Sequence, residues 1–345
     1  MNKKHDAIVY IGRFQIFHNA HLATIERAAK LTDNIVIVVG SAKQARSIRN
    51  PFTAAERIAV IKSATKHINA KIHIVQVMDN LYNDTAWVTS VQDQVNKTSL
   101  STREAEWESI GIIGHLKDDS SAYLAMFPQW NFIDVGQLAE IHSTNIRKDF
   151  FQEQFITFHE KNSIIIPTQS TEFLSAFHGS TAYNQLKSEI EYITAYKKPY
   201  ESLPYPIIFS TADAVVIQSG NIILIKRRSL PGKGLWALPG GFVNANTDRS
   251  VQDAMSRELR EETGLKVPMP VLIGNIERSK VFDAIDRSPR GRIITHAFKI
   301  VLPDGPLPKI KGRDDAEKAK WVPIASIKPE EMFEDHFSII QEMVG

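Results

Sequence analysis

The first 150 residues alternate short apolar runs with stretches whose apolar residues recur at helical spacing. The apolar runs cover residues 7–11, 34–40, 71–77, 110–114 and 131–135. Each run is apolar enough to be buried on both faces, which is typical of strands in a parallel sheet. Thr53 and Glu56 form a capping-box pattern before one of the helical stretches. This order predicts an α/β domain with a doubly wound parallel sheet.

The pattern changes after residue 150. Residues 175–196 favour a helix, and the proline-rich segment Lys197–Pro206 interrupts regular structure. Beyond it, the expected strands cover 207–217, 221–227, 271–276 and 293–302, one helix ends near Gly264 and another begins near Asp335. This order is α+β rather than doubly wound. We therefore expect one domain over 1–190, a linker over 191–206 and a second domain over 207–345.

Composition narrows the class of protein. Hydrophobic residues make up 43% of the 345 residues and charged residues 23%, which is ordinary for a globular protein with two domains. A net charge of +2 argues against a nucleic-acid partner, and no apolar run approaches the roughly 20 residues that span a bilayer. Without cysteine, thiolate catalysis and zinc–sulfur sites are excluded. We expect a cytoplasmic protein without a membrane partner, and a homo-oligomer stays open.

The first candidate site follows the first predicted strand. Gly12 forms a turn there, and His18 and His21 come just before or within the first turn of the next helix. A helix N-terminus presents unpaired amides and partial positive charge, and residues three apart face the same side. The pattern favours a phosphate chain as the ligand. Two surface histidines or half of a metal site fit the bare spacing equally well.

A second segment follows the fifth predicted strand. Ser143 and Thr144 place two hydroxyls at a helix start, and Arg147 lies within the following turn. Because the carboxyl ends of parallel strands share one edge of a sheet, a single triphosphate can contact both segments. The two motifs resemble the nucleotidyltransferase family with HxGH-type and ISxTxxR signatures, over residues 7 to about 190. His142 departs from the small residue usual in the second signature.

Further segments resemble the NMN adenylyltransferase branch of that family. They are Gly12–Gln15, Arg49–Thr53, Glu56–Arg57, Tyr82–Asp84 with Trp87, Gly114–His115, Lys117–Asp118 and Phe127–Trp130. Trp87 offers a flat ring face to a cationic nicotinamide, and Asp84 offers a hydrogen-bond acceptor. The apolar neighbours of Trp87 also fit a core residue.

The resemblance implies that the NMN phosphate attacks the α-phosphorus of ATP, with Mg²⁺ present, to give NAD and pyrophosphate. Positioning and charge neutralisation catalyse such transfers. It implies catalytic roles for His18, His21 and Arg147. It also implies binding of ATP by Gly12, Arg13, Phe14, Ser143, Thr144 and Gly114, and of NMN by Asp84, Trp87 and Arg49. Nicotinic acid mononucleotide is the alternative acceptor, because the sequence does not separate an amide from a carboxylate.

Three carboxylates crowd one face of the helix predicted before Gly264. Glu258, Glu261 and Glu262 are spaced i, i+3 and i+4. They repel one another and oppose the helix dipole near its C-terminus, so a divalent cation is their natural counter-charge. Oxygen-only ligands indicate Mg²⁺ or Mn²⁺. A solvated acidic face paired with neighbouring arginines is the alternative.

Together with the loop Leu238–Phe242, this helix resembles the Nudix box, G-x5-E-x7-R-E-U-x-E-E-x-G-U with U aliphatic. The box implies a Nudix fold, an α/β/α sandwich, and metal-dependent pyrophosphate hydrolysis. One part of the match is defective. Counting back from Arg257, Arg249 stands at the first glutamate, and the loop from Gly241 is two residues longer than the pattern. Asp248 can substitute for the first glutamate if the loop bulges.

Segments beyond the box resemble the Nudix subgroup that hydrolyses ADP-ribose to AMP and ribose 5-phosphate. They are Val281–Asp283, Arg287, Arg290–Arg292, Thr295–Phe298 and Gly312–Trp321. The resemblance implies that Arg287 and Arg292 bind the diphosphate. We prefer Glu317 as the general base, with Asp314 and Asp315 as rivals. Because the box is altered, a domain that binds ADP-ribose without cleaving it is the alternative.

Overall fold

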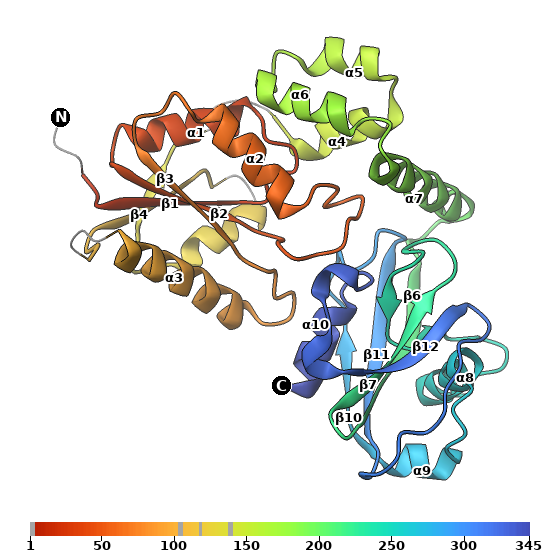
Figure 1. Cartoon of the computed structure of the whole chain (residues 1–345). Helices are drawn as coiled ribbons and strands as arrows, with labels where there is room; N and C mark the ends of the chain where they lie inside the picture. The colour runs from red at the N-terminus through yellow and green to blue at the C-terminus, as the bar shows by residue number, and fades with distance from the viewer. Residues whose placement is uncertain (1–3, 103–105, 117–118, 137–140) are drawn as a thin grey trace. The chain divides into compact units, whose positions relative to one another are not determined.

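The structure is a computed structural model of the chain, and it describes residues 4–102, 106–116, 119–136 and 141–345 (Figure 1). Lys117 and Asp118 of the nucleotidyltransferase-like motif lie outside these residues. Contacts divide the chain into two compact units, Met1–Lys187 and Ser188–Gly345, which are described separately. Within the described ranges, no helix combines the length and hydropathy needed to cross a membrane.

The first unit contains a parallel sheet of five strands in the order β3-β2-β1-β4-β5. The strands are β1 (Ala7–Gly12), β2 (Asn34–Val39), β3 (Lys71–Gln76), β4 (Ile110–Gly114) and β5 (Asn131–Asp134). The strand order reverses between β1 and β4, and ligands of open α/β sheets bind at the carboxyl ends of the strands beside such a switch point. The predicted doubly wound fold is confirmed.

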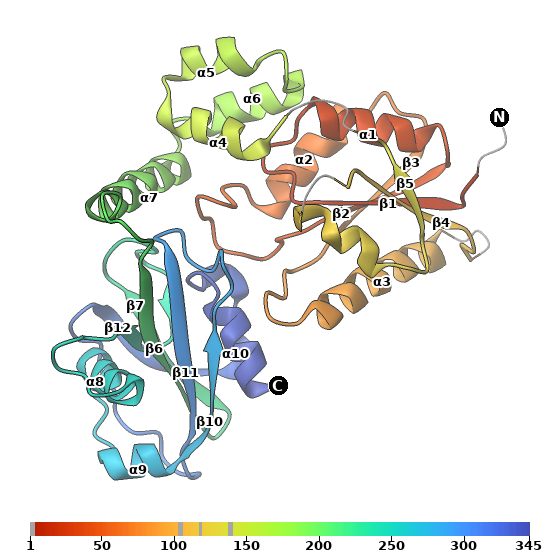
Figure 2. The same ribbon diagram turned by 180° about the vertical axis from the view of Figure 1, so that it is seen from behind.

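Helices cover both faces of this sheet (Figure 2). They are α1 (Asn19–Ala29) and α2 (Ala54–Ala64) on one face and α3 (Asp84–Ser101) on the other. Successive side chains of β1 point to opposite faces of the sheet and contribute to two separate cores. Ile8 packs with α1 and α2, while Val9 packs with α3. The capping box of Thr53 and Glu56 begins α2 as expected.

Burial on both faces is confirmed for β1 and β2, but the prediction is wrong for β3 and β5. These two strands are the edges of the sheet, and their side chains are partly or largely exposed. An edge strand loses one neighbour and part of the helical cover, which a run of apolar residues does not reveal.

Four helices follow the sheet in sequence. They are α4 (Ser143–Gln152), α5 (Phe155–Asn162), α6 (Thr168–Phe177) and α7 (Thr181–Lys197), after a short 3-10 helix over Asp119–Met126. The single helix expected over 175–196 is therefore wrong at its start. Gly179, with a φ of +76°, separates α6 from α7, and this left-handed conformation favours glycine.

The second unit is built on a mixed sheet with the main order β10-β11-β6-β7-β12. Its strands are β6 (Ile208–Gln218), β7 (Asn221–Arg227), β8 (Trp236–Ala237), β9 (Gly240–Phe242), β10 (Ile276–Phe282), β11 (Arg292–Val301) and β12 (Ala316–Pro323). The pair β6–β11 is parallel, and β7 pairs antiparallel with β6, β8 and β12. The predicted α+β order is confirmed.

The helices of this unit are α8 (Val251–Thr263), α9 (Met269–Gly274) and α10 (His336–Val344), with short 3-10 turns over Lys198–Tyr200, Ile324–Ser326 and Pro329–Glu331. α8 packs on one face of the sheet and α10 on the other (Figures 1 and 2). The strand expected over 271–276 is wrong, because α9 occupies most of it and β10 begins at Ile276. Pro268 and Pro270 favour a helix start there.

Candidate active sites

His18 and His21 cap the N-terminus of α1 reciprocally. The N–H of His21 donates to Nδ1 of His18 at 3.4 Å, and the N–H of His18 donates to Nδ1 of His21 at 3.2 Å. The two rings are stacked, with centroids 3.5 Å apart. Because both Nδ1 atoms accept, the proton of each neutral ring lies on Nε2.

Both rings are neutral at neutral pH. Burial lowers the pKa of His18 to about 4, and the charge of nearby His142 lowers it further. Burial, followed by the charge of His18, holds the pKa of His21 well below its usual value. Two uncharged Nε2–H donors at a helix N-terminus suit phosphate oxygens.

The two phosphate motifs, which lie far apart in sequence, meet in the structure. Arg147 is buried on α4 and donates to the carbonyl oxygen of Gln15, and its NH2 donates to Thr144 Oγ1 at 3.0 Å. The hydroxyl of Ser143 donates to the carbonyl oxygen of Ile16 at 3.3 Å. The start of α4 is thus fastened to the loop that follows β1.

Three arginines form the electropositive part of this site. Burial lowers the pKa of Arg147 to about 10, and the charges of Arg13 and Arg49 add to that effect. Three cations that repel one another beside a desolvated position favour an anion between them. The structure therefore brings together the histidines, hydroxyls and arginines that the sequence analysis assigned to a triphosphate.

The ends of β1 and β4 need glycine for packing. A Cβ atom on Gly12 would lie 2.8 Å from the Phe14 ring, and one on Gly114 would lie 2.9 Å from Leu124. Phe14 itself is 2% exposed, and its ring packs in the core of the first unit.

The sequence analysis placed Arg57 in a segment that resembles the NMN adenylyltransferase branch but gave it no role, and the structure shows that it supports the site. Its NH1 donates to the carbonyl oxygens of Arg13 at 2.6 Å and Gly40 at 2.7 Å, and its NH2 donates to that of Ser41 at 3.0 Å. The buried guanidinium thereby ties the loop after β1 to the loop after β2. The sequence around a helical arginine does not reveal hydrogen bonds to carbonyl oxygens of loops so far away along the chain.

The nicotinamide end of the expected site lies at the start of α3. Asp84 is the first residue of this helix and is exposed. Trp87 is half-buried, and its ring packs edge-on against Tyr123 at 6.1 Å and Phe127 at 5.8 Å between centroids. Trp87 thus contributes to the core and keeps part of its surface exposed.

The carboxylate site of the second unit depends on where α8 begins and ends. The Ser250 hydroxyl accepts a hydrogen bond from the N–H of Asp253 at 3.0 Å, and Gly264 ends the helix with a φ of +59°. Glu262, near the C-terminus, is 4% exposed and accepts a hydrogen bond from the N–H of Gly240 at 2.9 Å.

Burial raises the pKa of Glu262 to about 8, and the charges of Glu258 and Asp213 add to this. Burial also raises the pKa of Glu258. A Cβ atom on Gly241 would lie 2.5 Å from Glu258 Oε1, so glycine lets this carboxylate approach the backbone. Carboxylates that are desolvated and mutually repulsive are suited to a divalent cation.

Two of the α8 carboxylates form ion pairs with the side chain of Arg257. NH1 of Arg257 donates to Glu258 Oε1 at 2.8 Å and to Glu261 Oε2 at 2.9 Å. In the described part of the chain, no group of three or more histidine, aspartate or glutamate side chains is arranged to hold a metal ion. A carboxylate has two oxygens, so Glu258 and Glu261 can bind a cation through one oxygen while the other stays paired with Arg257.

The three candidate bases lie in the loop before β12 and at the start of that strand. Asp314 lies close enough to Glu258 for its charge to raise the pKa of that carboxyl. The N–H of Arg313 donates to the carbonyl oxygen of Glu262 at 3.0 Å, which holds the loop against the end of α8. Glu317 is exposed at an irregular position of β12. The geometry favours Asp314 over Glu317 as the acid nearest the carboxylates.

The structure corrects the role expected of Arg287. Its guanidinium makes two hydrogen bonds of 2.9 Å to Asp335, and the two side chains are 3% and 1% exposed. This ion pair fastens the loop after β10 to the start of α10 and is not presented to a diphosphate. Arg292 is partly exposed, with Asp283 3.9 Å away.

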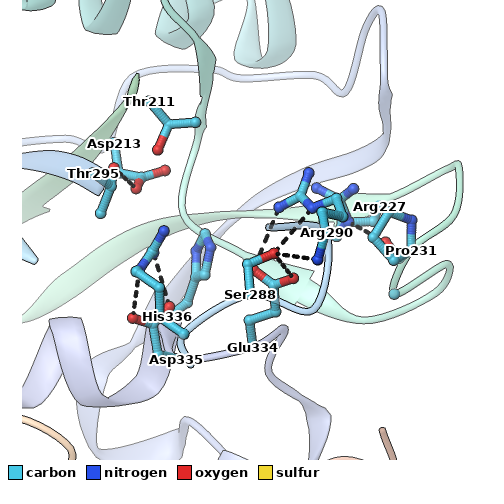
Figure 3. Close-up of polar contacts among 12 residues, drawn as sticks. Thr211, Asp213, Arg227, Pro231, Ser288, Arg290, Thr295, Glu334, Asp335 and His336 are labelled. Carbon is cyan, nitrogen blue, oxygen red and sulfur yellow. Dashed lines mark hydrogen bonds and ion pairs between the residues drawn. The ribbon is translucent and has the colours of Figure 1, made fainter. Parts of the chain in front are cut away.

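A buried polar cluster beside the carboxylates was missed from sequence (Figure 3). Asp213 accepts a hydrogen bond of 2.5 Å from Thr295 Oγ1, and burial raises the pKa of Asp213 to about 6. Arg227 and Arg290 lie over the Phe333 ring, at 4.1 and 5.7 Å from its centroid.

Of these two cations, Arg227 also interacts with the carboxylate site. Burial and the charge of Arg290 lower the pKa of Arg227, and the charge of Glu262 opposes that shift. The structure thus supplies a cation beside Glu262 that replaces Arg287 as a candidate for diphosphate contact.

Two family models match the chain. Residues 9–149 match the cytidylyltransferase-like family, and residues 209–343 match the NUDIX domain. A nicotinamide/nicotinic acid mononucleotide adenylyltransferase of Acinetobacter baylyi is 37% identical over 188 residues, which cover 54% of this chain and 94% of the relative. An ADP-ribose pyrophosphatase of Methanocaldococcus jannaschii is 35% identical over 145 residues, 42% of this chain and 77% of the relative.

Solved structures of a bifunctional NMN adenylyltransferase/ADP ribose pyrophosphatase from Francisella tularensis match both units, and one of them is complexed with AMP and a manganese ion. The match to this complex has a TM-score of 0.87 and 31% sequence identity, and it covers 99% of this chain and 98% of the other.

The pKa of Glu262 predicts a pH dependence of stability. Between its ordinary value of 4.5 and about 8, folded Glu262 retains a proton that the unfolded chain releases. In the presence of a chelator, the second unit should therefore lose stability as pH rises through this range. Glu262→Gln should flatten the trend in thermal midpoint against pH, whereas Glu261→Gln, at the exposed member, should preserve it. An unchanged slope in Glu262→Gln would contradict this interpretation.

Proposed function

The chain belongs to the family of bifunctional NMN adenylyltransferase/ADP ribose pyrophosphatases, and from this premise we propose how its two sites work. The first unit transfers the adenylyl group of ATP to NMN, forming NAD and pyrophosphate. The second unit hydrolyses ADP-ribose to AMP and ribose 5-phosphate with a divalent cation. Both reactions take place in the cytoplasm, in keeping with a chain that has no cysteine.

The first proposal rests on the contact between the two phosphate motifs, one with His18 and His21 and the other with Ser143, Thr144 and Arg147. A phosphate oxygen of NMN attacks the α-phosphorus of ATP, and the bond from that phosphorus to the bridging oxygen of the β-phosphate breaks. His18 and His21 donate from Nε2 to the phosphates, and Arg147 with Arg13 neutralises the charge that collects on pyrophosphate. Arg49 binds the NMN phosphate. No protein nucleophile takes part, so the rate enhancement comes from positioning of the reactants and neutralisation of their charge.

His18→Ala should lower kcat for NAD formation roughly 100-fold or more, because one preorganised donor to the reacting phosphates is lost. The measurement is NAD released from NMN, ATP and Mg²⁺. His67→Ala is the matched control, since His67 pairs with Glu26 on the exposed surface. Unchanged NAD output in His18→Ala would rule out this site. ADP-ribose cleavage by the same variant checks that the second unit is intact.

NMN is our proposed acceptor, with the base at Trp87 and Asp84. An exposed carboxylate at the start of α3 favours a cationic nicotinamide and opposes the extra negative charge of nicotinic acid mononucleotide. Asp84→Asn should therefore raise the use of the acid relative to NMN severalfold. The measurement is kcat/KM for each acceptor, with products separated by chromatography. If the wild-type protein prefers nicotinic acid mononucleotide, that compound rather than NMN is the acceptor.

Desolvation of the α8 carboxylates carries the second proposal. Glu258, Glu261 and Glu262 fit a divalent cation because burial penalises the charges of Glu258 and Glu262, and Glu261 adds a third carboxylate on the same helix. Oxygen ligands favour Mg²⁺, with Mn²⁺ as a substitute. When bound, the cation supplies charge neutralisation at the diphosphate and lowers the pKa of water.

The remaining side chains bind the substrate and move the proton. Arg227, with Arg292 from β11, neutralises the diphosphate oxygens. Asp314 of the loop before β12, or Glu317 at the start of β12, accepts the proton of the attacking water. The water oxygen forms a bond to one phosphorus, and the bridging P–O bond breaks to release AMP and ribose 5-phosphate.

Glu262→Gln should lower the rate of AMP formation from ADP-ribose roughly 100-fold or more, because a buried charge that faces the cation is removed. NAD formation by the first unit should be unchanged and serves as the control. Cleavage at the wild-type rate would exclude this carboxylate group as the metal site. Asp314→Asn and Glu317→Gln, compared in the same assay, identify the base.

The alternative for the second unit is a sensor that binds ADP-ribose without cleaving it. The altered box favours it. Tight binding of ADP-ribose by the wild-type protein in calorimetry, with no AMP formed in the presence of Mg²⁺, would support the sensor.

A further inference from the structure

The loop between β9 and α8 departs from the Nudix pattern, and it folds so that its extra residues face solvent. The side chain of Arg249, at the position of the first glutamate, is 89% exposed and pairs with Asp253 at 2.9 Å. The carbonyl oxygen of Asn244 accepts from the N–H groups of Thr247 at 3.3 Å and Asp248 at 2.9 Å. This turn points the side chain of Asp248 inward, where it is 4% exposed.

Arg257 binds both oxygens of the Asp248 carboxylate. Nε donates to Oδ1 at 3.0 Å, and NH2 donates to Oδ2 at 2.8 Å and to the carbonyl oxygen of Phe242 at 3.1 Å. NH1 is directed to Glu258 and Glu261. A guanidinium has five N–H groups, and every one here has an acceptor. Three of the acceptors are carboxylates, and two of these are proposed to bind the cation.

NH1 of Arg257 contacts one oxygen of Glu258 and one oxygen of Glu261. A carboxylate has two oxygens, so each glutamate can bind a cation while its other oxygen stays paired with NH1. The direction in which the two carboxylates face therefore depends on where the guanidinium is held. The bidentate contact with Asp248 fixes the guanidinium against the loop.

We propose that Asp248 replaces the missing first glutamate of the box as a positioning residue, holding Arg257 against the loop so that its NH1 orients Glu258 and Glu261 for a divalent cation. This inference rests on the proposed hydrolase function of the second unit and deepens it. The box that is incomplete in sequence is completed in the folded chain by the neighbouring aspartate.

Binding of Mn²⁺ to the full chain without nucleotide tests the proposal directly, by electron paramagnetic resonance or calorimetry. Asp248→Asn should raise the Kd for Mn²⁺ roughly 10-fold or more, as expected for a residue that orients metal ligands. Asp253→Asn removes the same charge nearby without touching Arg257 and should leave the Kd unchanged. Asp248→Glu keeps the carboxylate and should retain most of the affinity.

Arg257→Lys supplies a second measurement, because an ammonium cannot hold several carboxylates in one plane. It should weaken Mn²⁺ binding, and adding Asp248→Asn should weaken it no further, since the two residues act as one unit. An unchanged Kd in folded Asp248→Asn overturns the proposal, and so does additive loss in the double variant. Where Asp248→Asn does not fold, an unchanged Kd in Arg257→Lys overturns it.

Glu262→Gln separates this inference from the proposed function. If that variant loses Mn²⁺ binding while Asp248→Asn keeps it, the metal site stands and only the role of Asp248 fails. If Glu262→Gln binds Mn²⁺ like the wild type, the metal site and the role of Asp248 both fail.

Discussion

Both candidate sites gather charges of one sign around a buried charged group. In the first unit the buried group is the guanidinium of Arg147, with the exposed Arg13 and Arg49 nearby, and in the second it is the carboxylate of Glu262, with Glu258 nearby. Like charges in a desolvated position raise the free energy of the folded chain. The surrounding structure must hold these groups in place, and a ligand or cation of opposite sign relieves the repulsion.

The first unit holds its charges through main-chain oxygens of loops at the sheet edge. Arg147 donates to the loop after β1, and Arg57 ties that loop to the one after β2. The amide of Gln15 donates to the carbonyl oxygen of Phe52 at 2.8 Å and accepts from its N–H at 3.0 Å. The loop that carries Arg49 is thereby kept beside the histidines. Neutral capping histidines add donors without adding a further positive charge.

The second unit uses opposite charges for the same purpose. Arg257 holds Glu258, Glu261 and Asp248, while Arg227 lies near Glu262. Glu258 and Glu261 are thus already paired with an arginine in the absence of a cation. The ion pair of Arg287 with Asp335 belongs to the scaffold, because both groups are buried and satisfy each other.

Local patterns in the sequence determined the elements whose evidence lies within a few residues. The apolar runs of β1, β2 and β4, the capping box before α2 and the spacing of the glutamates on α8 belong to this class, because strand and helix geometry place such residues without reference to the rest of the chain.

Only the tertiary structure decided which distant groups meet. The edge positions of β3 and β5, the burial of Arg287 against Asp335 and the inward turn of Asp248 in place of Arg249 depend on packing between segments far apart or on loop conformation. A side chain's charge is visible in the sequence. Its partner is set by the folded backbone, since burial makes an unpaired charge costly and selects whichever opposite group the fold brings near.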